Sequence, residues 1–221
     1  AFAYGGAGIG SGRYASGQTH ITIDKAFVST PESSDASYTN ASGAGIGTGY
    51  GSQSDADIKI KDNSTVNAYS GTGAAIGSGV DTKGVTGISI TDSNVTAKAS
   101  HGTGIGSGAS SSGTTTIGIS GGTVTAEGGA SSFNGGAGIG AGSYSTGDTS
   151  ITLSGGVNVT ATGGGDSSSG GGGGAGIGSG SDATGNTTIN IKDAKEVTAN
   201  GGSTAAGIGS GRGVGSSQTG S

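Results

Sequence analysis

The chain of 221 residues contains no cysteine, no methionine, no tryptophan and only one proline. Without cysteine it has neither disulfide bonds nor thiolate ligands for a metal. Hydrophobic residues make up 29% and charged residues 10%, both well below the values of an ordinary globular domain. A conventional core of large side chains is therefore excluded for a chain of this length.

Charge is also scarce, and it is not clustered. The net charge is −5, with nine lysines and arginines against fourteen aspartates and glutamates. A protein that binds nucleic acid needs a basic stripe, and this sequence has none. It also lacks an apolar run of about 18 residues. We therefore expect no nucleic-acid partner and no membrane insertion.

Glycine is abundant, with 55 residues, and it is arranged periodically. The motif GGAGIGSG at residues 5–12 is the first of seven similar copies. Their central isoleucines are Ile9, Ile46, Ile76, Ile105, Ile139, Ile177 and Ile208. Disordered chains are usually charged and aperiodic, whereas this one is weakly charged and periodic. The pattern predicts a repeat fold.

Three further apolar positions recur at nearly fixed distances after each of the first six isoleucines. An aliphatic pair follows at offsets of 12 and 14 residues: Ile21/Ile23, Ile58/Ile60, Ile88/Ile90, Ile117/Ile119, Ile151/Leu153 and Ile189/Ile191. A valine follows at 19 or 20: Val28, Val66, Val95, Val124, Val159 and Val197. The larger variation in length lies between this valine and the next motif.

This arrangement predicts an all-β, single-stranded β-solenoid with three short strands per coil, joined by Gly/Ser/Asn/Asp turns. We expect six full coils and a partial seventh, rising about 4.8 Å per coil. Residues 1–221 form one domain in this interpretation, a fragment of a longer repetitive protein. Long inserts are expected near 29–43, 127–136 and 162–174. The handedness of the solenoid stays open.

The glycines of the motif suggest a second prediction. If Ala7, Ile9 and Ser11 face inward, the alternation of a strand places Gly8, Gly10 and Gly12 outward. The whole predicted face comprises Gly8, Gly10, Gly12, Gly45, Gly47, Gly49, Gly77, Gly79, Gly104, Gly106, Gly108, Gly138, Gly140, Gly142, Gly176, Gly178, Gly180, Gly207, Gly209 and Gly211. Such a flat face would suit a partner: another copy of the chain, associating laterally or end to end, a glycan or another extracellular surface.

Two alternatives to a binding face stay open for these glycines. Some of them can have positive φ or form a corner, as only glycine does readily. The long inserts can also fold back over the strand and cover it.

A polar row follows the valines: Ser29, Asn67, Thr96, Thr125, Thr160 and Thr198. Threonine ladders occur on ice-binding solenoids, which makes ice binding an alternative function. The middle outward position of the I-x-I strand is irregular, and Lys59 and Lys61 interrupt a flat face. A hydroxyl ladder is also ordinary strand surface.

Catalytic and metal-binding patterns are weak. Asp62, Asp92 and Asp193 share one offset, with Asp24 one position earlier, and aspartate commonly caps turns. Asp55 and Asp57 are spaced to share a face and are the candidate ligands for Ca²⁺. No other cofactor is expected.

His20 and His101 occupy unrelated repeat positions, which argues against a histidine-based site. Tyr14, Tyr50 and Tyr144 fall near one turn and predict a small aromatic patch. We therefore expect that the protein is not an enzyme.

The consensus GGAGIGSG…TITISGGTVTAxGG, clearest in Thr115–Gly129 and Gly135–Thr162, resembles glycine-rich repeats of large secreted and wall-anchored, adhesin-like proteins of Gram-positive, gut-type bacteria. The resemblance covers nearly the whole chain. It implies a β-helix fold, a cell-surface location and a non-catalytic role, either structural or carbohydrate-binding. It carries no site residues to transfer.

Overall fold

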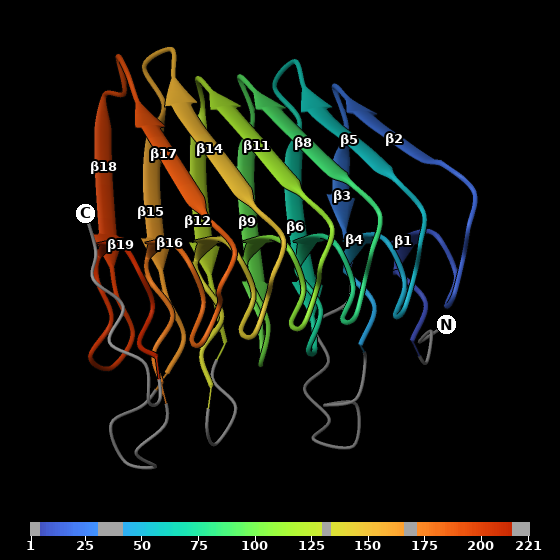
Figure 1. Cartoon of the computed structure of the whole chain (residues 1–221). Coiled ribbons are helices and arrows are strands. Elements are labelled where there is room, and N and C mark those ends of the chain that lie inside the picture. The colour runs from blue at the N-terminus through green and yellow to red at the C-terminus, as the bar shows by residue number, and fades with distance from the viewer. Residues whose placement is uncertain (1–4, 31–41, 130–133, 166–171, 214–221) are drawn as a thin grey trace.

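The computed structural model describes residues 5–30, 42–129, 134–165 and 172–213. These residues form nineteen strands and no helix, arranged in three parallel sheets. Figure 1 shows the coils following one another from the N- to the C-terminus, each adding one strand to each sheet. The predicted all-β solenoid with three strands per coil is confirmed.

Sheet A holds the isoleucine of each glycine motif and consists of two-residue strands. They are β1 (Ile9–Gly10), β4 (Ile46–Gly47), β7 (Ile76–Gly77), β10 (Ile105–Gly106), β13 (Ile139–Gly140), β16 (Ile177–Gly178) and β19 (Ile208–Gly209). Seven strands in sheet A against six in the other two sheets give six full coils and a partial seventh.

Sheets B and C have longer strands. Sheet B holds β2 (Thr19–Asp24), β5 (Ala56–Lys61), β8 (Thr86–Thr91), β11 (Thr115–Ser120), β14 (Thr149–Ser154) and β17 (Thr187–Ile191). Sheet C holds β3 (Phe27–Ser29), β6 (Thr65–Ser70), β9 (Asn94–Ala99), β12 (Thr123–Glu127), β15 (Asn158–Thr162) and β18 (Glu196–Asn200). Each strand of sheet B contains the predicted aliphatic pair, and each strand of sheet C contains the predicted valine.

Equivalent residues pair from coil to coil without a slip of register. Ile46 pairs with Ile76 in sheet A, Ile88 with Ile117 in sheet B and Val95 with Val124 in sheet C. A slip of one residue would turn every apolar side chain outward, so burial of one face fixes this register.

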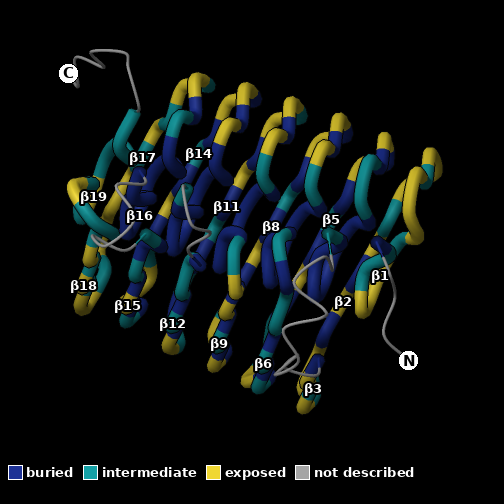
Figure 2. The backbone as a smooth tube through the Cα atoms, turned by 90° about the horizontal axis from the view of Figure 1, so that it is seen from below, coloured by how far each residue is buried: buried dark blue, intermediate teal, exposed yellow. Residues whose placement is uncertain are grey.

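The core lies between the sheets and is built from stacked identical side chains. Ile46, Ile76 and Ile105 are fully buried, as are Ile58, Ile60 and Val66. Figure 2 shows buried segments running along the inside of every inner coil. At the two ends of the stack this cover is missing, and Ile9 and Ile208 are 36% and 49% exposed.

The corners between strands use left-handed backbone. The position five residues after each of the first six motif isoleucines has a φ between 55° and 61°, and Tyr14, Asp81 and Asp182 are among its occupants. The corner between sheets B and C does the same, at Asp62, Asp92 and Asp193 among others. Because aspartate tolerates this conformation, its recurrence is explained as turn chemistry.

The predicted inserts all fall at the junction between sheets C and A. The described residues that flank their undescribed parts are Thr30 and Ser42, Gly129 and Asn134, and Gly165 and Gly172. The middle of each insert lies outside the described residues, so the prediction that inserts cover sheet A stays a prediction.

Candidate functional site

The predicted exposed glycine face is wrong. Gly47, which follows Ile46, has a φ of 141°, far from the strand region. A Cβ atom built on it would overlap the carbonyl oxygen of Gly77 in the next coil. Gly77, Gly106, Gly140 and Gly178 repeat this geometry. The chain turns at this glycine, and its Cα lies against the neighbouring coil instead of facing solvent.

The glycine before the isoleucine packs inward as well. A Cβ on Gly45 would overlap the carbonyl oxygen of Tyr69, and one on Gly138 would lie 2.7 Å from the amide nitrogen of Thr162. Sheet A is thus pressed against the ends of the sheet C strands. Fourteen of the predicted face residues are buried: Gly45, Gly47, Gly49, Gly77, Gly79, Gly104, Gly106, Gly108, Gly138, Gly140, Gly142, Gly176, Gly178 and Gly180.

The remaining six candidates lie in the end coils. Gly8, Gly10 and Gly12 are exposed, and Gly207, Gly209 and Gly211 are half-buried. Their exposure follows from the missing neighbour coil.

The alternation of side chains between the two faces of a strand does not hold for the glycine motif. Each sheet A strand has only two residues and ends at a glycine with positive φ, so the alternation does not continue beyond it. Backbone geometry therefore accounts for the glycines that follow the isoleucines.

The serine or threonine two residues after the motif isoleucine also has a structural role. The Ser78 hydroxyl accepts a 3.0 Å hydrogen bond from the amide of Gly108, one coil further on. The Thr48 hydroxyl accepts one of 3.2 Å from Gly79, and the Ser107 hydroxyl one of 3.0 Å from Gly142. We call this series the hydroxyl ladder. It supplies acceptors for buried amides that would otherwise be costly.

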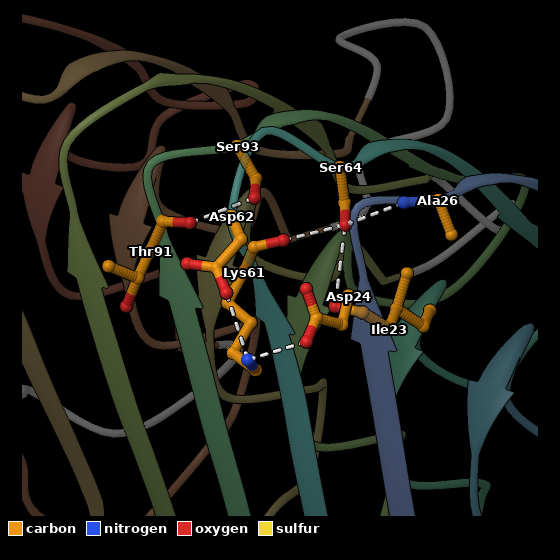
Figure 3. Close-up of polar contacts among 8 residues, drawn as sticks. All are labelled: Ile23, Asp24, Ala26, Lys61, Asp62, Ser64, Thr91 and Ser93. Atoms are coloured by element: carbon orange, nitrogen blue, oxygen red, sulfur yellow. Dashed lines mark hydrogen bonds and ion pairs between the residues drawn. The ribbon is translucent and has the colours of Figure 1, made fainter.

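Two of the recurring aspartates, Asp24 and Asp62, are paired with a lysine within the fold (Figure 3). The Lys61 ammonium lies 2.7 Å from an Asp24 carboxylate oxygen and 2.9 Å from one of Asp62. Its hydrogen bonds to Asp24 and then to Asp62 raise the pKa of Lys61, and the hydrogen bond from Lys61 lowers the pKa of Asp62. At the same corner the Ser64 hydroxyl donates to the Lys61 carbonyl oxygen at 2.7 Å. These contacts close a corner.

The two calcium candidates have separate partners. Asp55 accepts a 2.8 Å hydrogen bond from the amide of Val85 in the next coil. Asp57 lies 2.6 Å from the Lys59 ammonium and 3.7 Å from Nδ1 of His20. The hydrogen bond from Lys59 lowers the pKa of Asp57, and His20 contributes less. No group of three metal-ligating side chains occurs within the described ranges.

Asp148 repeats the contact of Asp55. It stands at the same repeat offset and accepts a 2.9 Å hydrogen bond from the amide of Asn186, again one coil on. Carboxylates at this offset therefore join adjacent coils, a role that the sequence did not reveal.

The predicted aromatic patch forms in part. The rings of Tyr14 and Tyr50 meet edge to face, with centroids 5.6 Å apart. The Arg13 guanidinium lies 4.7 Å and 5.0 Å from the two centroids. A hydrogen bond with Asp81 raises the pKa of Tyr50. Tyr144 occupies the turn position of Tyr14 four coils further along and is 48% exposed, so it does not join this cluster.

Sheet C presents the most regular polar surface. The predicted row after the valines is in register, since Asn67 pairs with Thr96, Thr96 with Thr125 and Thr125 with Thr160. A second row, before the valines, was missed: Thr65, Asn94, Thr123 and Asn158. We call these eight residues of β6, β9, β12 and β15 the polar face. Aligning the residue on each side of the valine would have revealed both rows.

A β-helix repeat family model matches residues 58–80, 117–143 and 189–212 of the chain. The matched stretches include the I-x-I segments of β5, β11 and β17, and each extends into the next glycine motif. Together with the stacked parallel sheets, these matches support a β-helix repeat architecture for the chain. No curated protein and no solved structure matches the chain. No helix within the described residues is long and apolar enough to span a membrane.

Proposed function

We propose that the chain is a non-catalytic module of an extracellular, adhesin-like or structural protein of the bacterial surface. It acts as a rigid scaffold that spaces and presents binding surfaces. One observation carries this proposal. All three sheets keep their register from coil to coil, while the variation in length falls in the chain between sheets C and A.

The acidic side chains that could serve catalysis are instead used in structural contacts, which supports a non-catalytic role. Asp55 and Asp148 hold backbone amides of adjacent coils, and Asp57 is paired with Lys59. The resemblance to wall-anchored repeats favours a location outside the cell. Labelling of intact cells with an antibody against the chain tests that location, and labelling only after lysis would contradict it.

The scaffold role is tested by a distance measurement. Because the chain has no native cysteine, spin labels can be placed at will. Thr22→Cys and Asn190→Cys lie at equivalent positions of β2 and β17, five coils apart, so their backbones are separated by about 24 Å. Pulsed electron resonance should give one narrow distance. The pair Thr22→Cys and Thr152→Cys should be shorter by about 5 Å, one coil. A broad distribution for both pairs would contradict a rigid rod.

Carbohydrate binding is the second candidate function, and the polar face favours it. Lateral self-association through the glycine motifs of the inner coils has lost its basis, because those glycines are buried. End-to-end association through the exposed end coils stays a prediction. Ice binding gains the second polar row, but charged residues border that surface, namely Lys98 and Glu127.

A further inference from the structure

The polar face has an unusual combination of exposure and unused hydrogen-bonding capacity. Its eight side chains are exposed or half-buried. None of them makes a side-chain hydrogen bond within the part of the chain that the structure describes. The buried hydroxyls of the hydroxyl ladder, by contrast, are bonded from coil to coil. The donors and acceptors of the polar face are therefore available to a ligand.

The spacing of these groups is regular in two directions. Along the stack, each row repeats once per coil, about every 4.8 Å. Across the strands, the two rows are two residues apart, about 6.6 Å. Because parallel pairing fixes both spacings, the array is preorganised and loses little conformational freedom on binding.

The charge of the face restricts its partner. No charged side chain lies in either row from β6 to β15. The charges that border the face are Glu196 of β18, which pairs with Asn158 in the neighbouring strand, and Lys98 and Glu127, which form a 3.2 Å ion pair with each other in the next row. A phosphate or uronate polymer would find no cation among the eight side chains. Hydroxyl and carboxamide groups both donate and accept, as the hydroxyls of an uncharged sugar do.

Two aromatic side chains lie on the same side of sheet C. Phe27 of β3 is 72% exposed and stands in register with Thr65. Tyr69 of β6 is two residues beyond Asn67 and points to the same face. An exposed ring on a folded surface favours an apolar contact, which the faces of a sugar ring provide. These rings lie near the β6 end of the polar face.

We propose that the polar face, with Phe27 and Tyr69 at one end, binds a neutral polysaccharide. The proposal rests on the extracellular surface role given above. Each coil presents one pair of hydroxyl or amide groups, so a repetitive polymer would make several weak contacts at once. Such multivalency raises overall affinity without any single strong site.

The test uses two charge variants that match in coil and strand position. Thr96→Lys with Thr160→Lys places charge in the polar face, in β9 and β15. The control, Ser89→Lys with Thr152→Lys, places it at the middle outward position of sheet B in the same two coils. Circular dichroism checks that both retain the β fold. Binding is measured by affinity electrophoresis and pull-down on cellulose, mannan, starch and a mixed-linkage glucan, with polygalacturonate as the charged comparison.

We expect retention on at least one neutral polymer, a loss of at least tenfold in the sheet C variant and less than twofold in the control. Phe27→Ala should weaken the same binding about fivefold. Absence of binding to every neutral polymer, equal effects of the two charge variants, or binding to polygalacturonate alone would overturn the proposal. Thermal hysteresis lost in the sheet C variant without any polysaccharide binding would assign the face to ice. The interspin distance reports on the scaffold separately, so the two proposals fail independently.

Discussion

The backbone amide of Gly142 donates a 3.0 Å hydrogen bond to the hydroxyl of Ser107 in the preceding coil. The same bond recurs along the hydroxyl ladder, but Ala141 interrupts it in the fifth coil. Buried amides without acceptors are costly, so each rung contributes to the stability of its own interface between coils.

Replacement of a rung should therefore destabilise the protein, and repair of the interruption should stabilise it. We expect Ser107→Ala to lower the free energy of unfolding by about 1–2 kcal/mol, and Ala141→Ser to raise it by about 0.5–1 kcal/mol by giving Gly180 an acceptor. Urea denaturation measures both. Thr116→Ala, on the exposed face of sheet B, is the control and should change it by less than about 0.5 kcal/mol. A neutral Ser107→Ala would contradict the role of the ladder.

A second prediction concerns the glycine that follows each isoleucine. Because this glycine is buried at a turn, replacing it should destabilise the fold, whereas replacing a glycine on an exposed face would not. Gly106→Ala should lower the free energy of unfolding by about 3 kcal/mol or more. The new Cβ would overlap the carbonyl oxygen of Gly140, and the backbone at Gly106 has a φ of 144°. Gly118→Ala is the matched control. A Cβ on residue 118 would have only one neighbour, 4.0 Å away. The substitution should therefore raise the free energy of unfolding by about 0.5 kcal/mol, since alanine fits a strand better than glycine. Thermal melts that rank the two variants the other way would refute this assignment.

Acid should weaken the first two coils through Asp57. Lys59 lowers the pKa of Asp57 in the folded state. A group with a lowered folded pKa contributes stability above its unfolded value, about 3.9, and loses that contribution as pH falls through the folded value. The effect is small because the pair is exposed and screened by salt. Carboxyl NMR should show the pKa of Asp57 below the ordinary range and rising in Lys59→Ala; no change in that variant would exclude the pairing.

The position of the variable segments predicts where extra residues are tolerated. A Gly-Ser insertion within residues 130–133, between sheets C and A in the chain, should lower the free energy of unfolding by less than about 1 kcal/mol, because the number of residues between these sheets already differs from coil to coil and each further residue adds little closure entropy. The same insertion between Ser110 and Ser111 should cost more than about 2 kcal/mol, because it moves Ser111 away from its 2.8 Å hydrogen bond with Thr82. Comparable denaturation midpoints would show that the spacing is not constrained.

The strands of sheets B and C were predictable because their apolar residues alternate over enough positions to define a face. Ile88 and Ile90, for example, pair with Ile117 and Ile119 as expected. The orientation of the sheet A glycines was not predictable in the same way. The sequence does not reveal the φ of a glycine, because glycine adopts both negative and positive values. A strand of two residues is also too short for alternating side chains to define its inner and outer face.

The candidate sites show the same division. The Tyr14–Tyr50 contact follows from two tyrosines near equivalent turn positions, and that patch was predicted. The inter-coil contacts of Asp55 and Asp148 were not, because they depend on which amide of the next coil lacks a strand partner. The polar face needed both neighbours of each valine to be aligned, and the prediction used only one.

The in-register pairing of like with like has a consequence for how such a molecule changes over time. Ile76 meets an isoleucine on either side, Ile46 and Ile105, and neither contact depends on where in the stack it occurs. Duplication or deletion of a whole coil therefore preserves the isoleucine pairing of sheet A. The rod can lengthen or shorten by genetic recombination in steps of about 4.8 Å, with the packing of its core unchanged.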